Sequence, residues 1–314
     1  MNDRAAGAAT MAPPIQGAAA LAGQKGPPVW LGMDQKALDD AYDQAVYAPN
    51  RDQVLGRNRW NSERTRARLG APQRFAYGAT PIEGLDVYAT KVPNAPVNVF
   101  IHGGAWRQRD AKDYALLAET FVNGGAHFVV PDFSGVEATN GSLMPIAAQV
   151  RRAVAWVYGN AARFGGDPNR IYVSGQSSGA HLAGVILITD WEKDFAVPAD
   201  IVKGALLCSG MYDLKPVRLS KRSEYVAFTD ESEHALSAQR HLARINCPVI
   251  VAHGTLETPE FIRQARDFAA ALEKAGKPVR LLVAEGYNHF EILETLATPY
   301  GLLGRAALEQ MRLP

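Results

Sequence analysis

The stretch "IYVSGQSSGAHLAG", residues 171–184, decides the fold. Four residues that favour a buried strand lead into a corner with Gly175, Ser177 and Gly179, and the residues that follow are typical of a helix. Small residues are needed wherever a strand turns sharply into a helix. Two interpretations are therefore open. Either the small residues are there only because the backbone turns sharply, or the turn presents Ser177 as a catalytic residue.

The chain on either side of this corner repeats the change from strand to helix. From about residue 83, apolar runs alternate with amphipathic stretches, and "GLDVYAT" alternates apolar and polar residues like a half-buried strand. The continuous runs suit strands covered on both faces. They are "VNVFI", "HFVVP", "RIYVSG", "KGALLCSG", "CPVIVAHG" and "KPVRLLVAEG". This order predicts an α/β fold with a doubly wound, mostly parallel sheet and helices on both faces. Ligands then bind at the carboxyl ends of the strands.

Two stretches between or before these runs are expected to be helical. "TPEFIRQARDFAAALEKAG" begins with Thr258 as N-cap and Pro259 at the first helical position, and it ends at Gly276. Residues 34–69 are charged and are also typical of helix.

The chain is expected to form one folded unit. Residues 1–28 are rich in Ala, Gly and Pro and lack the apolar block of a secretory signal, so they are predicted to be a flexible N-terminal arm. No linker divides residues 29–314, which are predicted to be a single domain. Residues 211–246 contain no clear strand and are interpreted as a small helical lid.

The composition is that of an ordinary globular protein. Of the 314 residues, 47% are hydrophobic, and the net charge of +1 gives no reason to expect a nucleic-acid or membrane partner. No apolar run approaches the roughly 20 residues of a membrane helix.

The two cysteines, Cys208 and Cys247, are expected to be buried free thiols in a reducing compartment, which predicts a cytoplasmic location. Neither spacing suggests a metal site. The sequence leaves a homo-oligomer open.

The context of Ser177 favours a catalytic role. The pattern G-x-S-x-G is weak alone, but here it follows a predicted strand and opens a predicted helix, as a nucleophile elbow requires. A second glycine-rich turn, "FIHGGAW" at residues 100–106, ends an earlier strand. Its backbone N–H groups at Gly104 and Ala105, with that of Ser178, are predicted to form an oxyanion hole. His102 in this turn is expected to be structural.

A serine nucleophile also needs a base and an acid. Among seven histidines, His289 follows the last strand directly, which is where the histidine of such a hydrolase belongs. His181 and His253 are expected to pack or to shape their loops. For the acid, Glu257 after the penultimate strand is favoured, and Asp213 after the strand before it is the alternative.

These residues resemble the kynurenine formamidase (arylformamidase) branch of the α/β-hydrolases, which is close to small carboxylesterases. The resemblance covers nearly the whole chain after residue 28 and rests on five segments in the family's order. They are "HGGAW", "GQSSGAHLAG", "SGMYDLKP", "TLETPEFIRQ" and "NHFEILETL". The resemblance implies that the family's nucleophile falls on Ser177, its histidine on His289 and its acid on Glu257, where the family usually has aspartate.

The leading hypothesis is a serine hydrolase that cleaves a small, aromatic carboxylic ester or amide through an acyl-enzyme, without metal or organic cofactor. Its partner is then a small-molecule substrate. Four aromatic residues at predicted strand ends are expected to line the pocket: Trp106, Phe133, Tyr212 and Tyr287. N-formylkynurenine hydrolysis is the alternative activity. A non-catalytic binding module is a second alternative, which loss of the serine, the histidine or the glycines would have marked.

Overall fold

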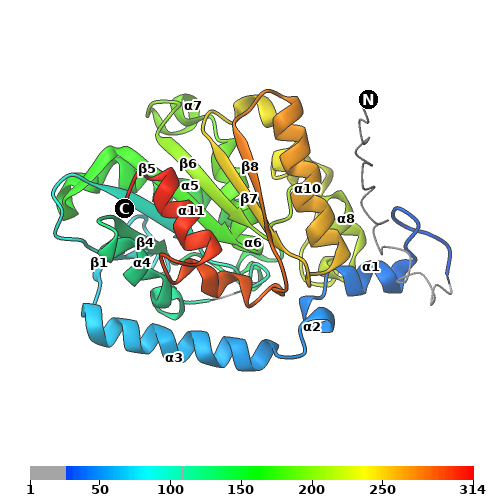
Figure 1. Cartoon of the computed structure of the whole chain (residues 1–314). Coiled ribbons are helices and arrows are strands. Elements are labelled where there is room, and N and C mark those ends of the chain that lie inside the picture. Colours follow the sequence, from blue (N-terminus) through cyan, green and yellow to red (C-terminus); the bar gives the residue numbers. More distant parts are fainter. Residues whose placement is uncertain (1–25, 108) are drawn as a thin grey trace, which may run out of the picture.

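The computed structural model describes residues 26–107 and 109–314, so the predicted flexible arm lies almost wholly outside the described residues. Within that part of the chain, eight strands form one sheet in the order β1-β2-β4-β3-β5-β6-β7-β8 (Figure 1). β1 and β2 pair antiparallel, β2 pairs antiparallel with β4, and all further pairs are parallel. The strands are β1 (Gln73–Ala76), β2 (Gly84–Tyr88), β3 (Ala95–Ile101), β4 (His127–Pro131), β5 (Gly166–Gln176), β6 (Val202–Cys208), β7 (Val249–Gly254) and β8 (Val279–Ala284).

Helices cover both faces of this sheet, which confirms the predicted α/β-hydrolase fold. Because successive strand side chains alternate between faces, Val99 joins the apolar cluster with α5, α6 and α10, whereas Phe100 joins the cluster with α4 and α11. The helices of the N-terminal half are α1 (Gln35–Ala41), α2 (Gln44–Tyr47), α3 (Arg51–Leu69), η2 (Ala111–Leu117), α4 (Ala118–Asn123), η3 (Val136–Thr139), α5 (Met144–Asn160) and η4 (Ala161–Phe164). Those of the C-terminal half are α6 (Ser178–Leu187), α7 (Trp191–Phe195), α8 (Leu214–Leu219), η5 (Lys221–Glu224), α9 (Asp230–Ala235), η6 (Ala238–Arg240), η7 (Leu242–Arg244), α10 (Pro259–Lys274), η8 (Ile292–Leu296) and α11 (Leu302–Gln310).

The predicted ends of α10 are confirmed. The Thr258 side chain accepts a hydrogen bond from the backbone N–H of Phe261, and Pro259 is the first helical residue. The helix ends at Lys274, and Gly276 follows with a φ of +69°, a conformation that glycine adopts without steric cost. This helix follows the loop that carries Glu257, so its fixed start helps to place that loop.

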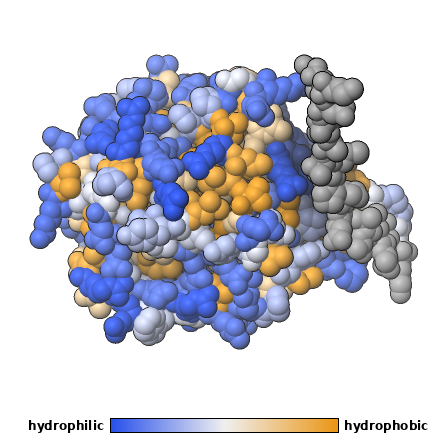
Figure 2. All heavy atoms as spheres, viewed as in Figure 1, coloured by the Kyte–Doolittle hydropathy of each residue, from blue (hydrophilic) through white to orange (hydrophobic). Residues whose placement is uncertain are grey.

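The strand β8 departs from the expectation that every apolar run is covered on both faces. It is an edge strand, and its Leu281 and Val283 are 38% and 41% exposed. Figure 2 shows apolar side chains gathered on this face of the molecule. The sequence pattern could not reveal this, because an apolar run looks the same at the edge and in the middle of a sheet.

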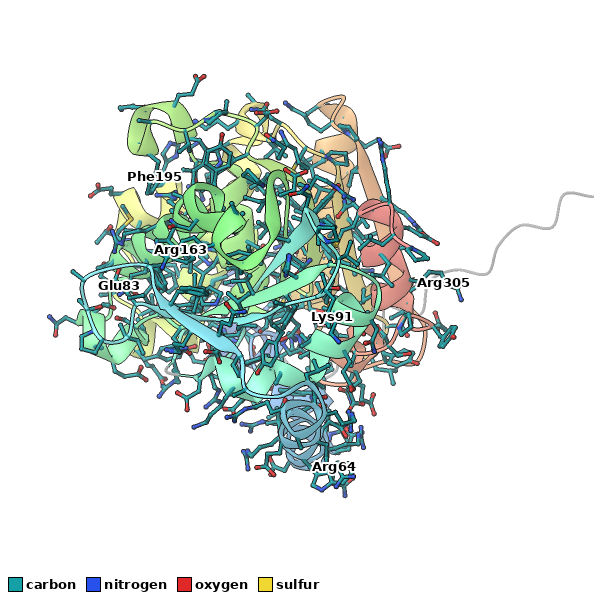
Figure 3. The ribbon with its side chains drawn as sticks, turned by 90° about the vertical axis from the view of Figure 1, so that its left-hand side faces the viewer. Arg64, Glu83, Lys91, Arg163, Phe195 and Arg305 are labelled. Carbon is teal, nitrogen blue, oxygen red and sulfur yellow. The ribbon has the colours of Figure 1, made fainter. Side chains whose placement is uncertain are left out.

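The N-terminal helices lie against the loops at the carboxyl ends of the strands. The Ser62 hydroxyl of α3 donates a hydrogen bond to the carbonyl of Asp113 in η2, and Arg57 pairs with Glu294 at 2.7 Å. Figure 3 shows α3 end-on at the margin of the molecule, with Arg64 pointing away from the body. The helix therefore presents one side to solvent and the other to the strand-end loops.

The segment 211–246 consists of short helices and connecting loops, in agreement with the absence of a strand signal. Its function as a lid stays a prediction. None of the helices in the described ranges is both long enough and apolar enough to span a bilayer. Cys208 and Cys247 are buried and free.

Candidate active site

Ser177 lies at a strained corner between β5 and α6. Its φ of 60° and ψ of −128° are costly for a residue with a side chain. The flanking glycines are required by close backbone contacts, since a Cβ on Gly175 would lie 2.5 Å from the carbonyl oxygen of Gly179. A Cβ on Gly179 would lie 2.0 Å from the carbonyl oxygen of Ile101. The corner therefore has both of the roles considered from the sequence. It allows the backbone to turn sharply, and it presents Ser177 to a cavity.

Ser177, His289 and Glu257 form one continuous hydrogen-bonded row. His289 Nε2 lies 2.9 Å from Ser177 Oγ, and His289 Nδ1 lies 2.7 Å from Glu257 Oε2. Ser177 is 7% exposed, and His289 and Glu257 are each 3% exposed. When Nδ1 carries the proton and donates it to the carboxylate, Nε2 keeps a lone pair for the serine hydroxyl proton.

The sheet register explains why these distant residues meet. In the parallel pairs, Ile101 of β3 lies beside Gly175 of β5, and Gly254 of β7 lies beside Ala284 of β8. The loops that follow neighbouring parallel strands therefore leave the same edge of the sheet together. The β3 and β5 loops carry the glycine-rich turn and the serine, and the β7 and β8 loops carry the acid and the histidine.

The Glu257 carboxylate is held by two further donors. Its Oε1 accepts hydrogen bonds from the Ser209 hydroxyl at 2.6 Å and from the backbone N–H of Gly254 at 2.7 Å. Bonds to both oxygens fix the carboxylate plane relative to the imidazole. Ser209 opens the segment "SGMYDLKP", which carries the family resemblance, but nothing in that segment assigned a role to its hydroxyl.

The alternative acid Asp213 has a different role. It caps α8, where its Oδ1 accepts from the backbone N–H of Lys215 at 3.1 Å and from Arg240 at 2.9 Å. Its hydrogen bonds are thus made to a helix start and a surface arginine, while His289 is bonded to Glu257. The geometry favours Glu257 as the partner of the histidine.

The turn after β3 offers unpaired backbone donors beside Ser177. Gly104 and Ala105 have φ values of +120° and +58° and line the cavity. Their N–H groups, and that of Ser178 at the start of α6, make no hydrogen bond within the described residues. The backbone N–H of Trp106 donates to Ser178 Oγ at 3.1 Å, which ties this turn to the helix. The arrangement can stabilise an oxyanion on a carbonyl attacked by Ser177.

Two of the other histidines are buried among packing partners, as expected. His102 stacks on Phe133 with ring centroids 4.1 Å apart, and burial lowers the pKa of His102 to about 4. His181 Nδ1 accepts from the indole N–H of Trp106 at 3.1 Å, its Nε2 donates to the carbonyl of Leu236 at 3.0 Å, and burial lowers the pKa of His181 to about 4. Both rings are therefore neutral parts of the scaffold near neutral pH.

The cavity in front of Ser177 has a volume of about 730 Å³. Its wall contains none of the four aromatic residues that the sequence suggested. Trp106 and Tyr212 are fully buried, Phe133 packs on His102, and Tyr287 is 39% exposed away from the lining. The aromatic residues that do line the cavity are Tyr42, Tyr114, Tyr225 and Phe290. A strand end locates a side chain near the site but not the direction in which it points.

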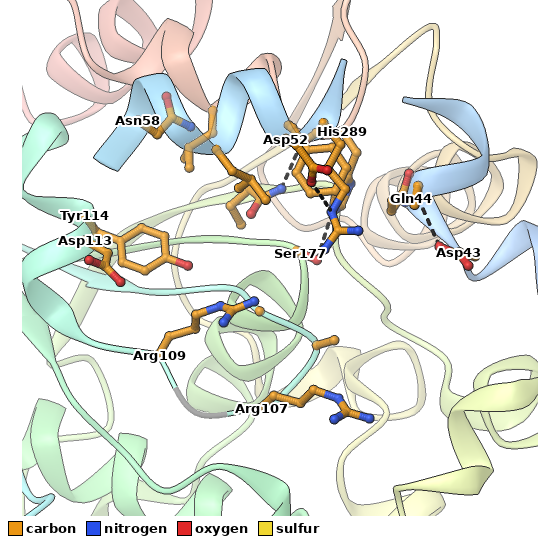
Figure 4. Close-up of a pocket in the computed structure, with 18 of the residues that line it drawn as sticks. Asp43, Gln44, Asp52, Asn58, Arg107, Arg109, Asp113, Tyr114, Ser177 and His289 are labelled. Carbon is orange, nitrogen blue, oxygen red and sulfur yellow. Dashed lines mark hydrogen bonds and ion pairs between the residues drawn. The ribbon is translucent and has the colours of Figure 1, made fainter. Parts of the chain in front are cut away.

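The N-terminal helices supply much of the cavity wall, which sequence reasoning missed. Figure 4 shows Gln44, Asp52 and Asn58 on the α2–α3 side and Arg107 and Arg109 on the opposite side. The lining residues from this segment include Gln44, Arg51, Asp52, Leu55, Asn58 and Arg59. Charged residues on a helix are ordinarily interpreted as a solvated face, so only the tertiary structure reveals them.

Comparison with known proteins finds relatives that match most of the chain. The kynurenine formamidase of Danio rerio is 30% identical over 295 residues, which cover 90% of this chain and 98% of the relative. That of Salmo salar is 33% identical over 243 residues, covering 75% of this chain and 80% of the relative. The chain belongs to the kynurenine formamidase family. The resemblance expected from the sequence is thereby confirmed.

The chain is also similar to other families and structures of hydrolases. The BD-FAE family model matches residues 85–205, and the prolyl oligopeptidase family model matches residues 148–298. The structure of a candidate thioesterase from Silicibacter sp. TM1040 superposes with a TM-score of 0.74 at 25% identity, covering 85% of this chain and 97% of that one. The chain is accordingly an ester or amide hydrolase with the α/β-hydrolase fold.

Proposed function

We propose that the chain hydrolyses a small carboxylic ester or amide with an aromatic group, through an acyl-enzyme on Ser177. The observation that carries this proposal is the hydrogen-bonded row from Ser177 through His289 to Glu257, with distances of 2.9 and 2.7 Å. A hydroxyl with a neutral imidazole in contact, itself held by a carboxylate, is an activated nucleophile.

In the acylation step, Ser177 Oγ attacks the substrate carbonyl carbon and His289 Nε2 takes the hydroxyl proton. Glu257 holds the ring and stabilises the imidazolium that forms. The new oxyanion accepts hydrogen bonds from the N–H groups of Gly104, Ala105 and Ser178. The intermediate then collapses, and the bond to the leaving oxygen or nitrogen breaks as His289 returns the proton to it.

Deacylation repeats these steps with water. His289 Nε2 takes a proton from a water molecule as its oxygen attacks the acyl carbon. The second tetrahedral intermediate expels Ser177 Oγ, which recovers its proton from His289. The products are a carboxylic acid and an alcohol or amine, and every proton is accounted for by the same imidazole.

The aromatic part of the proposal rests on the cavity lining. Tyr114, Tyr225 and Phe290 offer ring surfaces to a planar substrate group, whereas Tyr42 beside them is almost fully buried. N-formylkynurenine hydrolysis is the alternative, because the two formamidase relatives span most of this chain. In that reaction the acyl group is formyl, and the same three residues act. The non-catalytic binding module is disfavoured, since no catalytic group is missing.

A substrate panel tests the proposal. Aryl esters, anilides and N-formylkynurenine are compared at equal concentrations with the wild-type chain and with Ser177→Ala. We expect turnover of at least one class and a loss of at least about 10³-fold in the variant, which should keep the wild-type thermal unfolding. Turnover retained in Ser177→Ala would refute the assignment of the nucleophile.

Three coarser expectations stand beside this function as proposals. Residues 29–314 act as one domain, and the helical segment 211–246 serves as a lid that contributes Lys221, Arg222 and Tyr225 to the cavity wall. The buried free thiols of Cys208 and Cys247 fit a cytoplasmic location.

A further inference from the structure

The wall of the catalytic cavity carries an excess of positive charge. It contains six basic and only three acidic side chains: Arg51, Arg59, Arg107, Arg109, Lys221 and Arg222 against Asp43, Asp52 and Asp113. Some of these cations have carboxylate partners. Lys221 pairs with Asp43, and Arg107 pairs with Glu137 at 2.9 Å. Hydrolysis of a neutral ester does not require this excess of positive charge, so the charge indicates a further property of the substrate.

Arg222 is the cation whose surroundings are most unusual. It is only 7% exposed, and it forms no ion pair with a carboxylate in the part of the chain that the structure describes. One Nη donates to the hydroxyl of Tyr225 at 2.7 Å, the other donates to the carbonyl of Tyr42 at 2.9 Å, and the buried Nε has no partner. Burying a charge without a counter-ion is costly. The Asp43 carboxylate interacts with Arg222 only from beyond ion-pair distance and is itself paired with Lys221, so the guanidinium keeps the capacity to bind a further anion.

Gln44 is a second unsatisfied group on the same wall. It is 6% exposed, and neither its amide nitrogen nor its amide oxygen has a hydrogen-bond partner. It lies two residues beyond Tyr42, whose carbonyl binds Arg222. Buried carboxamides are normally satisfied. Two buried polar side chains with unused donors thus belong to the cavity wall.

We propose that Arg222 and Gln44 form a subsite for a carboxylate on the substrate, apart from the bond that is cleaved. The inference rests on the proposed function, because it concerns the same cavity. The Arg222 guanidinium lies 5.7 Å over the Trp106 ring, and Trp106 directly follows Ala105 of the oxyanion turn. A carboxylate bound there lies beside the reacting carbonyl. The planar fork of arginine matches the two oxygens of a carboxylate, and the glutamine amide adds a donor.

Two matched pairs of esters test this subsite. Phenyl acetate is compared with 3-carboxyphenyl acetate, which carries the charge on the leaving group, and phenyl butyrate with monophenyl succinate, which carries it on the acyl group. In the wild-type chain we expect kcat/KM for at least one charged ester to exceed that of its neutral partner by about tenfold or more. Equal values within both pairs would overturn the proposal.

Substitutions then assign the preference to Arg222. Arg222→Met should bring the charged-to-neutral ratio of kcat/KM close to one, and Arg222→Lys should leave an intermediate ratio, because it keeps the charge but not the fork. Gln44→Leu should lower the ratio severalfold. Arg107→Gln is the matched control, since it removes an equal charge from the same wall, but from an arginine already paired with Glu137. A ratio that falls equally in Arg107→Gln, or that persists in Arg222→Met, would contradict the subsite.

A binding measurement separates this inference from the proposed function. Calorimetry on Ser177→Ala should show 3-carboxyphenyl acetate or monophenyl succinate binding about tenfold more tightly than its neutral partner, and Arg222→Met added to that variant should abolish the difference. If neutral esters are turned over through Ser177 without any charge preference in rate or binding, the function stands and the subsite fails. If charged esters bind selectively but none is cleaved, the subsite stands and the function fails.

Discussion

Glu257 reaches one methylene further than an aspartate would, and its carboxylate meets His289 Nδ1 at 2.7 Å. Glu257→Gln should lower kcat/KM by about 10³- to 10⁴-fold, because the amide no longer stabilises the imidazolium. Asp213→Asn is the matched control at the next strand end, where the carboxylate caps α8. We expect it to change kcat/KM less than about threefold. Steady-state kinetics would contradict the assignment of Glu257 as the acid if Asp213→Asn lost kcat/KM by the larger factor and Glu257→Gln by the smaller.

Ser209 is a positioning residue for the same carboxylate. Ser209→Ala removes the 2.6 Å hydrogen bond to Glu257 and should lower kcat about tenfold with little change in KM. Ser174→Ala serves as control, because that buried hydroxyl also donates at 2.6 Å to a side-chain oxygen, the one of Asn98. The control should lose stability but keep kcat. Equal losses of kcat in both variants would show that Ser209 has no specific role.

For single residues, the sequence predicts those whose role is marked by a motif and by its position after a strand. Ser177 and His289 could be placed because the order of strands and loops determines which residues meet at the sheet edge. Ser209, Gln44 and Arg222 could not, since their roles depend on which way a side chain points and on which partners it lacks.

Among the elements, the β5–α6 corner depends on two glycines that make close contacts. Gly179→Ala should destabilise the fold by several kcal/mol or prevent soluble expression, because the added Cβ would lie 2.0 Å from the Ile101 carbonyl oxygen. Gly159→Ala near the end of α5 is the control, with nothing within 4 Å of the added Cβ. That change should stabilise by up to about 1 kcal/mol. Thermal unfolding of both variants checks the pair, and similar effects would contradict this account of the corner.

The elements also show where sequence reasoning ends. Strand order and the ends of α10 follow from periodicity and capping, which are local properties. The contribution of α2 and α3 to the cavity wall depends instead on tertiary contacts between distant segments. It depends on contacts such as the Asn50 amide bonded to Glu291 at 2.6 Å, which joins the start of α3 to the loop that carries His289. Charge on an isolated helix carries no such information.

For the whole molecule, buried histidines couple stability to pH, because burial lowers the pKa of His102, His127, His181 and His253. His102 and His181 have folded-state pKa values of about 4, below the ordinary value near 6.5. The unfolded chain therefore binds more protons between these limits, so the free energy of unfolding rises with pH there. The stabilisation is complete above pH ~6.5 and is lost as the pH falls toward ~4, by roughly 3 kcal/mol for each histidine.

Chemical denaturation between pH 5 and 7 measures this slope. His181→Asn should reduce this slope even if the variant is less stable at every pH, because one of the buried titrating rings is gone. His234→Asn is the control, since His234 is exposed. An unchanged slope in His181→Asn would show that this ring is not neutral in the folded protein.

Covalent labelling by a fluorophosphonate, followed by peptide mass spectrometry, tests directly whether Ser177 is a nucleophile activated by His289. We predict one adduct, on Ser177, formed about 10³-fold more slowly in His289→Ala because no imidazole accepts the hydroxyl proton there. An adduct on another residue, or equal labelling rates in the wild-type chain and His289→Ala, would contradict this prediction.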